Sequence, residues 1–171
     1  MKKTLLLLTI FLSGISSFAQ VAVDSLNIKT IASDSIPRAS GWVNDFEKIY
    51  TKAEIKSLDS LIAAFEKKKG YEIAIITLDA NYTNDTTFDR YITAVANAWG
   101  VGKKGKDNGM VIGISSEFGR IRIVNGAGVT TYLSDDATKI IIDTIFIPNF
   151  QQGNYYKGTK EALLEIMKKL K

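Results

Sequence analysis

The stretch that fixes the fold class is Tyr71-Glu72-Ile73-Ala74-Ile75-Ile76-Thr77-Leu78. Its apolar, β-branched centre is typical of a strand that is covered on both faces. A helix is predicted before it, because Thr51 and Glu54 fit a capping box and Gly70 stops the helical pattern. The apolar residues of that helix recur on one face: Ile55, Leu58, Leu61, Ile62 and Phe65.

The chain after this strand predicts a second helix and then a β-hairpin. The helix carries apolar residues at helical spacing over 88–99. The hairpin joins the apolar run 110–114 to the alternating run 120–124 through a loop of about five residues. Two further helices are predicted, over about 135–148 and about 155–170. Helices and strands alternate around one small sheet, so the class is α/β.

The N-terminus has the three parts of a secretory signal peptide: a basic start, a short apolar core and a small-residue end. We expect residues 1–19 to be removed, with cleavage between Ala19 and Gln20. Residues 20–40 lack a sustained apolar period and are interpreted as a flexible leader, and 41–171 as one folded domain. No later apolar run is long enough to span a bilayer, so we expect an exported protein, periplasmic or secreted, with no membrane span in the mature chain.

Composition narrows the chemistry that the chain can perform. It contains no cysteine and no histidine, which removes thiolate nucleophiles, the usual zinc ligands and the commonest general base. The formal charge falls from +4 to +2 once Lys2 and Lys3 leave with the signal peptide, so nothing indicates nucleic-acid binding. Carboxylate, hydroxyl, lysine and arginine chemistry remains, and we expect a monomer.

A glycine-framed loop, Lys104-Gly105-Lys106-Asp107-Asn108-Gly109, carries the first candidate site. Asp107 and Asn108 offer oxygen atoms, and such ligands suit a hard cation, Ca²⁺ or alternatively Mg²⁺. The same residues are also an ordinary turn signal. The spacing of the loop resembles a phosphate-binding P-loop, but it lies between a helix and a strand in the wrong order and lacks Ser or Thr after its lysine.

One loop cannot supply the 6 to 8 oxygens that calcium takes, so other acids must converge on it. The candidates are Asp45, which follows the motif Val43-Asn44, and Asp135 with its neighbour Asp136. The alternative for the last two is plain N-capping of a helix. Lys106 and Arg122 are candidates for holding an anion or phosphate, the alternative being solvated surface charge.

Read together, the ordered motifs resemble the TPM domain, an exported α/β domain of bacteria and thylakoids. They are Val43-Asn44-Asp45, the string from Trp99 to Gly109, Arg122 with Gly126-x-Gly128, Leu133-x-Asp135, and Ile147-Pro148 to Tyr156. The resemblance implies an α/β/α sandwich with a small mixed sheet of about four strands and about four helices. It also implies an acidic surface pocket for a divalent cation, usually calcium, at Asp45, Asp107, Asn108 and Asp135. Val124 and Thr130 stand where many relatives carry further acids.

Three functions follow as expectations. The first is a divalent-cation-binding module of the cell envelope with an accessory or binding role. The second is a metal-assisted acid phosphatase, an activity proposed for plant members, in which the cation activates water and Arg122 or Lys106 holds the phosphate. It lacks an evident general base, and the catalytic residues stay unknown. The third is an interaction module that docks on an envelope protein.

Overall fold

The computed structural model describes residues 35–170, and the predicted signal peptide and most of the leader lie outside that range. The described chain forms one sheet of four strands in the order β1-β2-β3-β4. The strands are β1 (Val43–Asp45), β2 (Glu72–Thr77), β3 (Gly109–Ser115) and β4 (Arg120–Asn125). The helices are α2 (Lys52–Lys69), α3 (Phe88–Trp99), α4 (Ala127–Thr130), α5 (Asp135–Ile141), the π-helical turn η2 (Ile142–Phe146), α6 (Ile147–Phe150) and α7 (Tyr155–Lys169).

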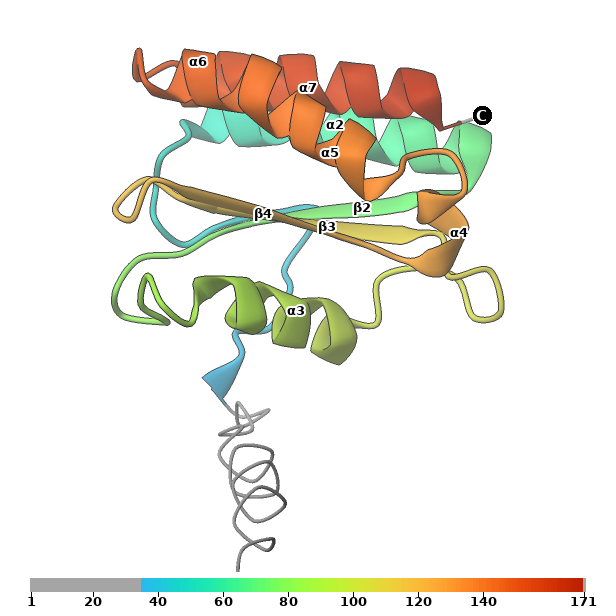
Figure 1. Cartoon of the computed structure of the whole chain (residues 1–171), viewed down its shortest axis with the longest axis horizontal. Coiled ribbons are helices and arrows are strands. Elements are labelled where there is room, and N and C mark those ends of the chain that lie inside the picture. Colours follow the sequence, from blue (N-terminus) through green and yellow to red (C-terminus); the bar gives the residue numbers. More distant parts are fainter. Residues whose placement is uncertain (1–34, 171) are drawn as a thin grey trace, which may run out of the picture. The chain divides into compact units, whose positions relative to one another are not determined.

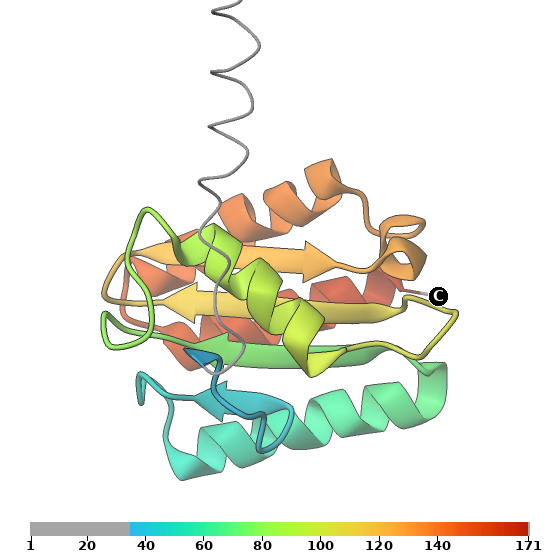
Figure 2. The same cartoon turned by 90° about the horizontal axis from the view of Figure 1, so that it is seen from below.

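Two layers of helices enclose the sheet, which confirms the predicted sandwich. Figure 1 shows α2, α5, α6 and α7 on one face and α3 alone on the other, and Figure 2 shows α3 crossing the sheet. Alternation along β2 sends Ile73 and Ile75 into the core under α2 and α7, where they join Leu58, Ile62, Leu163 and Ile166. The intervening residues face α3, and a Cβ on Gly113 would lie 2.4 Å from the Ile92 side chain. The helix therefore packs directly on the sheet there.

Strand direction gives the domain two unlike ends. Strands β1, β2 and β3 are parallel, and β4 returns antiparallel to β3. The carboxyl ends of β1 and β2 therefore lie beside the β3–β4 turn, which we call the hairpin end (left in Figure 1). The segment 100–108, which precedes β3, lies at the opposite end together with α4, and we call this the glycine-loop end (right in Figure 1).

Local signals in the sequence account for the main helix boundaries. Thr51 and Glu54 form the predicted capping box at the start of α2, and Gly70 ends that helix with a φ of 82°. The third predicted helix is the continuous series α5–η2–α6. It contains a π turn, closed by a bond from Ile147 N–H to the Ile142 carbonyl, immediately before Pro148, whose ring nitrogen cannot donate.

The end of the predicted leader contacts the domain. Tyr91 Oη donates to the Ser35 carbonyl at 2.6 Å, and Trp99 Nε1 donates to the Pro37 carbonyl at 2.8 Å. Both donors belong to α3, so residues 35–40 run against that helix. Within 35–170, no helix combines the length and the apolar character needed to cross a bilayer.

Candidate functional site

Three glycines bring the backbones of two segments together at the glycine-loop end. A Cβ on Gly109 would lie 1.9 Å from the Val101 carbonyl oxygen, and one on Gly126 would lie 2.1 Å from that of Asp107. A Cβ on Gly128 would lie 2.2 Å from the Lys106 carbonyl oxygen. Gly126 N–H donates to the Gly109 carbonyl, and Gly128 N–H donates to the Asp107 carbonyl, each at 2.9 Å. The glycine loop and the Gly126-x-Gly128 turn are therefore one packed backbone unit, and side chains are excluded from their contact.

Asn108 fastens this unit to the rest of the domain. Its Oδ1 accepts from Lys103 N–H at 2.9 Å, and its Nδ2 donates to the Gly70 carbonyl at 2.7 Å. The residue is only 8% exposed. Because both polar atoms of the amide already brace the loop, the contacts of Asn108 favour a structural role and give no support to the predicted role as a cation ligand.

Asp107 is the carboxylate that the loop presents to solvent. Its φ of 46° lies in the left-handed region, and its side chain is exposed. It lines a pocket of about 350 Å³ between the glycine loop, the end of α3 and the end of β4. Lys103 and Lys104 line the same pocket, and Lys103 Nζ lies 3.9 Å from a carboxylate oxygen of Glu66. Among residues 35–170, Asp107 is the only acid in the lining.

Asn125 lines this pocket and also the cavity on the α5 side of β4, and no sequence motif marks it. Its Nδ2 donates to Thr138 Oγ1 at 3.0 Å, while its Oδ1 is buried and has no hydrogen-bond partner within residues 35–170. A buried acceptor without a donor is costly, but this amide lies beside Thr138 on the α5 side of β4, whereas the Asp107 pocket lies on the α3 side, so the atom is not a ligand in that pocket. Nothing in the sequence separates Asn125 from an ordinary strand-end asparagine, because the signal lies in the packing.

Asp135 and Asp136 begin α5 at the same end of the domain. Ser134 caps the helix, with its Oγ accepting from Ala137 N–H at 3.2 Å, and both acids lie in the first turn, where the helix dipole favours negative charge. Asp135 lines a second cavity, of about 540 Å³ along β4, and not the pocket that contains Asp107. Asp136 is exposed and lines neither cavity. Neither aspartate is the N-cap, so the capping alternative does not hold for them, and their interaction with the helix dipole accounts for both positions.

Asp45 lies at the hairpin end, so the prediction of one pocket shared by Asp45, Asp107 and Asp135 is wrong. Asp45 pairs in register with Thr77 at the carboxyl end of β2, whereas Asp107 precedes the amino end of β3. The length of the sheet separates them, about 20 Å at the usual rise of a strand. Asp45 accepts three hydrogen bonds, from Ile49 N–H at 3.1 Å, Tyr50 N–H at 2.9 Å and Thr77 Oγ1 at 2.6 Å.

The other carboxylates at the hairpin end also hold loops. Glu47 accepts from the backbone N–H groups of Ser116 and Glu117 at 2.9 and 2.8 Å. Glu117 in turn accepts from Ala80 N–H at 2.8 Å. Ligand sites of α/β proteins usually lie at this end of the strands, but here the acids are occupied by backbone donors. Across residues 35–170, no three acidic side chains gather closely enough to hold a metal ion without other ligands.

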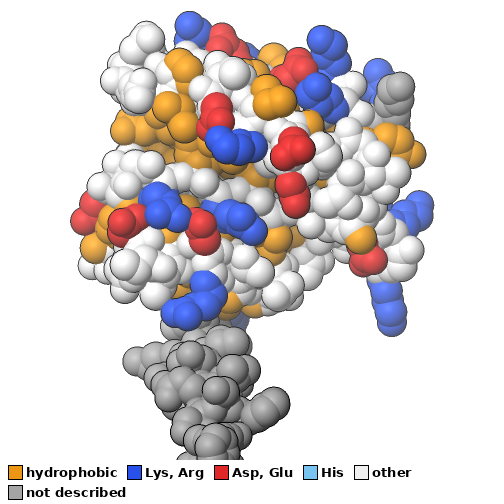
Figure 3. Space-filling model, viewed as in Figure 1, with side chains coloured by type: hydrophobic (Ala, Val, Ile, Leu, Met, Phe, Trp, Pro, Cys, Tyr) orange, Lys and Arg blue, Asp and Glu red, His pale blue; other side chains and the backbone are white. Residues whose placement is uncertain are grey.

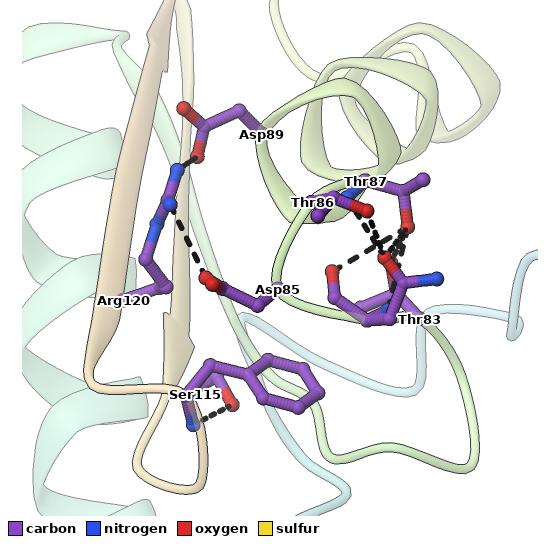
Figure 4. Close-up of polar contacts among 9 residues, drawn as sticks. Thr83, Asp85, Thr86, Thr87, Asp89, Ser115 and Arg120 are labelled. Carbon is purple, nitrogen blue, oxygen red and sulfur yellow. Dashed lines mark hydrogen bonds and ion pairs between the residues drawn. The ribbon is translucent and has the colours of Figure 1, made fainter.

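The predicted anion-binding residues lie apart from one another. Arg122 is exposed and lines the second cavity, while Lys106 is exposed on the glycine loop and lines neither cavity. The neighbouring Arg120 is committed to two ion pairs, with Asp85 at 3.2 Å and Asp89 at 2.9 Å, as Figure 4 shows. The hydrogen bond to Asp89 is the main cause that raises the pKa of Arg120. These cations do not form a single phosphate clamp.

The fold and this pocket define a small three-layer α/β domain with a loop pocket at the amino ends of its central strands. The chain belongs to the TPM domain family, whose model matches residues 43–169, and this confirms the resemblance read from the sequence. A comparison with curated proteins finds no match.

Three solved structures have a similar fold. The N-terminal domain of a protein from P. gingivalis is 25% identical over 82% of this chain and 88% of that one, with a TM-score of 0.70. The BA42 protein of the psychrophilic bacterium Bizionia argentinensis is 22% identical, covering 73% of this chain and 83% of its own, with a TM-score of 0.61. The N-terminal domain of the cg2496 protein from Corynebacterium glutamicum is 11% identical, covering 82% and 87%, with a TM-score of 0.58.

Proposed function

We propose that the chain is an exported accessory module of the cell envelope that binds one divalent cation, Ca²⁺ or alternatively Mg²⁺, in the loop pocket. The observation that carries the proposal is the exposed carboxylate of Asp107, which lines the loop pocket together with Gly100, Gly102, Gly109 and Gly126, where backbone carbonyls can approach a bound ion. A carboxylate, an amide oxygen, loop carbonyls and water are the ligands that hard cations take.

The charges around the pocket set the expected strength of binding. Asp107 supplies one negative charge, and Lys104 opposes it, while the ammonium of Lys103 lies close to Glu66. Calcium affinity rises with the number of charged ligands, and modules outside the cell bind with dissociation constants of about 10⁻⁴ to 10⁻³ M. We expect this site to lie at the weak end of that range, which suits a compartment with millimolar calcium.

Binding without catalysis agrees best with the side chains present. A metal-assisted phosphomonoesterase needs a base beside the attacking water and cations around the phosphate. The pocket has one carboxylate and two lysines, and Arg122 lines a different cavity. Asp107 cannot be at once the main ligand of the cation and a free general base.

Calorimetric titration with CaCl₂, supported by amide shifts in NMR spectra, tests the proposal. The purified chain should bind with a dissociation constant near 10⁻³ M. Asp107→Asn, which removes the charge and suits the left-handed φ, should weaken binding about tenfold or more. Asp136→Asn is the matched control, because it removes the same charge from an exposed site outside the pocket.

A variant that is expected to strengthen calcium binding provides a second test of the pocket. Lys104→Glu replaces the cation that opposes Asp107 with a second carboxylate in the lining of the pocket and should tighten calcium binding about tenfold. If Asp107→Asn bound calcium as the parent chain does, the pocket would not be the site. Hydrolysis of an aryl phosphate that needs the cation and disappears in Asp107→Asn would instead establish the phosphatase alternative.

A further inference from the structure

The open edge of the sheet at β4 supports an inference that does not depend on the cation. In the antiparallel β3–β4 ladder, Gly126 pairs with Gly109 through a bond from its N–H to the Gly109 carbonyl. Hydrogen-bonded and non-bonded pairs alternate along such a ladder. The backbone N–H and C=O groups of Ile121, Ile123 and Asn125 therefore point away from β3. The same alternation holds on β3. Ile114, opposite Ile121, directs its carbonyl away from β4, where it accepts a hydrogen bond from Leu78 N–H on the β2 side.

These outward groups have no partner inside the domain. None of the hydrogen bonds found within residues 35–170 reaches the backbone N–H or C=O of Ile121 or Ile123. At the far end, the bond from Asn125 Nδ2 to Thr138 ties β4 to α5 and closes the edge. The free part of the edge thus spans about Gly119 to Val124, which is long enough to pair with a short extended segment.

A groove runs beside this free edge. Its first part is the cavity of about 540 Å³ that Ile121 to Asn125 line with α5, and its second part is a cavity of about 310 Å³ lined by Ile121, Ile147 and Phe150. The two cavities share Ile121, and we call them together the β4 groove. Figure 3 shows an apolar band on this face below the α5–α6 layer, with charged side chains beneath it. Ile147, which lines the second cavity, is 37% exposed.

One face of β4 carries apolar side chains and the other carries arginines, so the groove should favour a peptide with a matching pattern. Ile121 and Ile123 face the α5–η2–α6 layer, whereas Arg120 and Arg122 face the α3 side. A strand paired with β4 would place alternate side chains against Ile142, Ile147 and Phe150, and the others beside Arg122. The charged residues that line the groove are Asp89, Arg122, Asp135 and Lys139.

The ion pairs formed by the charged residues of the groove indicate which kind of residue should lie opposite Arg122. Asp89 is paired with Arg120, and Lys139 is paired with Asp143. Arg122 forms no salt bridge with any residue in 35–170. A second copy of the chain is a poor occupant, because antiparallel β4–β4 pairing would bring two unpaired Arg122 side chains onto one face.

We propose that β4 binds an extended peptide segment of a partner protein by strand addition, and that this segment carries apolar residues at alternate positions with an acidic residue opposite Arg122. The main-chain bonds to Ile121 and Ile123 provide affinity, and the apolar band and Arg122 provide specificity.

Fluorescence anisotropy with the purified chain and a labelled peptide of about eight residues, alternating valine and glutamate, tests the proposal. The peptide should bind saturably, and EDTA should leave the affinity unchanged. Lysine in place of glutamate should weaken binding about tenfold, and Arg122→Glu should reverse the preference between the two peptides. Arg90→Glu, an exposed change on α3 outside the groove, is the charge-matched control.

A backbone probe requires no change in the protein. Methylating the peptide nitrogens that would face β4 should abolish binding, and the unmodified peptide should slow hydrogen exchange at the amides of Ile121 and Ile123. Equal binding of the methylated peptide, or an unchanged preference in Arg122→Glu, would overturn the proposal. So would a dimer of the free chain in which these two amides are already protected, because the edge would then belong to a second copy.

Discussion

The substitution Asp45→Asn tests whether the carboxylate of Asp45 has a structural role or binds a metal ion. The carboxylate accepts from two backbone N–H groups and from the Thr77 hydroxyl. An asparagine retains a single acceptor oxygen, so its NH₂ group must face a donor, either Tyr50 N–H or Ile49 N–H. The hydroxyl can rotate to adapt, but a backbone N–H cannot.

The size of the effect follows from these contacts. A hydrogen bond to a charged group contributes about 1.5–3 kcal/mol, and a donor left without an acceptor costs about 1–3 kcal/mol. Since Asp45 is partly exposed, water recovers some of this loss. We expect the free energy of unfolding to fall by about 2–3 kcal/mol, which corresponds to a melting temperature lower by about 5–10 °C in a domain of this size.

Urea unfolding, followed by circular dichroism, measures this change with and without calcium. The loss should be the same in EDTA and in millimolar CaCl₂, because the bonds that are lost lie within the protein. Asp136→Asn, which removes an exposed charge, should change stability by no more than about 1 kcal/mol. A loss in Asp45→Asn that appeared only with calcium would refute the structural role and restore this residue as a ligand.

Two further variants test other contacts of the fold. Asn108→Ala should lower the free energy of unfolding by about 2 kcal/mol, measured by urea denaturation, because Lys103 N–H and the Gly70 carbonyl both lose their partner; an effect below about 0.5 kcal/mol would contradict the bracing role. Burial raises the pKa of Tyr50 above its ordinary value of 10, so stability that is fully present below pH 10 should be lost as pH rises beyond it. Tyr50→Phe should cost about 1 kcal/mol at neutral pH through the lost bond to Thr159 and should flatten the alkaline decline seen in thermal melts, whereas an equally steep decline would place its origin elsewhere.

Much of the fold was predictable because its signals are local. The capping box at Thr51, the stop at Gly70 and the hairpin over 110–124 each depend on residues close in sequence, and the structure confirms them. The sequence does not predict the π turn before Pro148. Its position depends on how the helix packs, and the sequence pattern does not encode that.

The prediction that Asp45 and Asp107 share one pocket is wrong because of the direction of the strands. A strand, helix and strand in succession give parallel strands through right-handed crossovers. Asp45 is the last residue of β1 and Asp107 precedes β3, so parallel strands must place these acids at opposite ends.

The contacts of individual side chains were beyond sequence reasoning. The bonds from Glu47 to the hairpin join residues far apart in the chain, and the burial of the Asn125 amide oxygen depends on packing. The free edge at β4 likewise follows from the order of the strands, with no motif to mark it. Of the two proposed sites, the cation pocket therefore depends on a sequence motif as well as on packing, whereas the β4 edge depends on tertiary placement alone.

The close backbone contact of Gly109, Gly126 and Gly128 changes what the family motif means. These glycines are required because any side chain would strike a carbonyl oxygen across the contact. A chain can therefore keep the motif for the sake of folding alone, whatever it binds. Glycines that two chains share therefore indicate a common fold. Whether the chains also share an activity depends on the side chains around the pocket and along the open edge of β4.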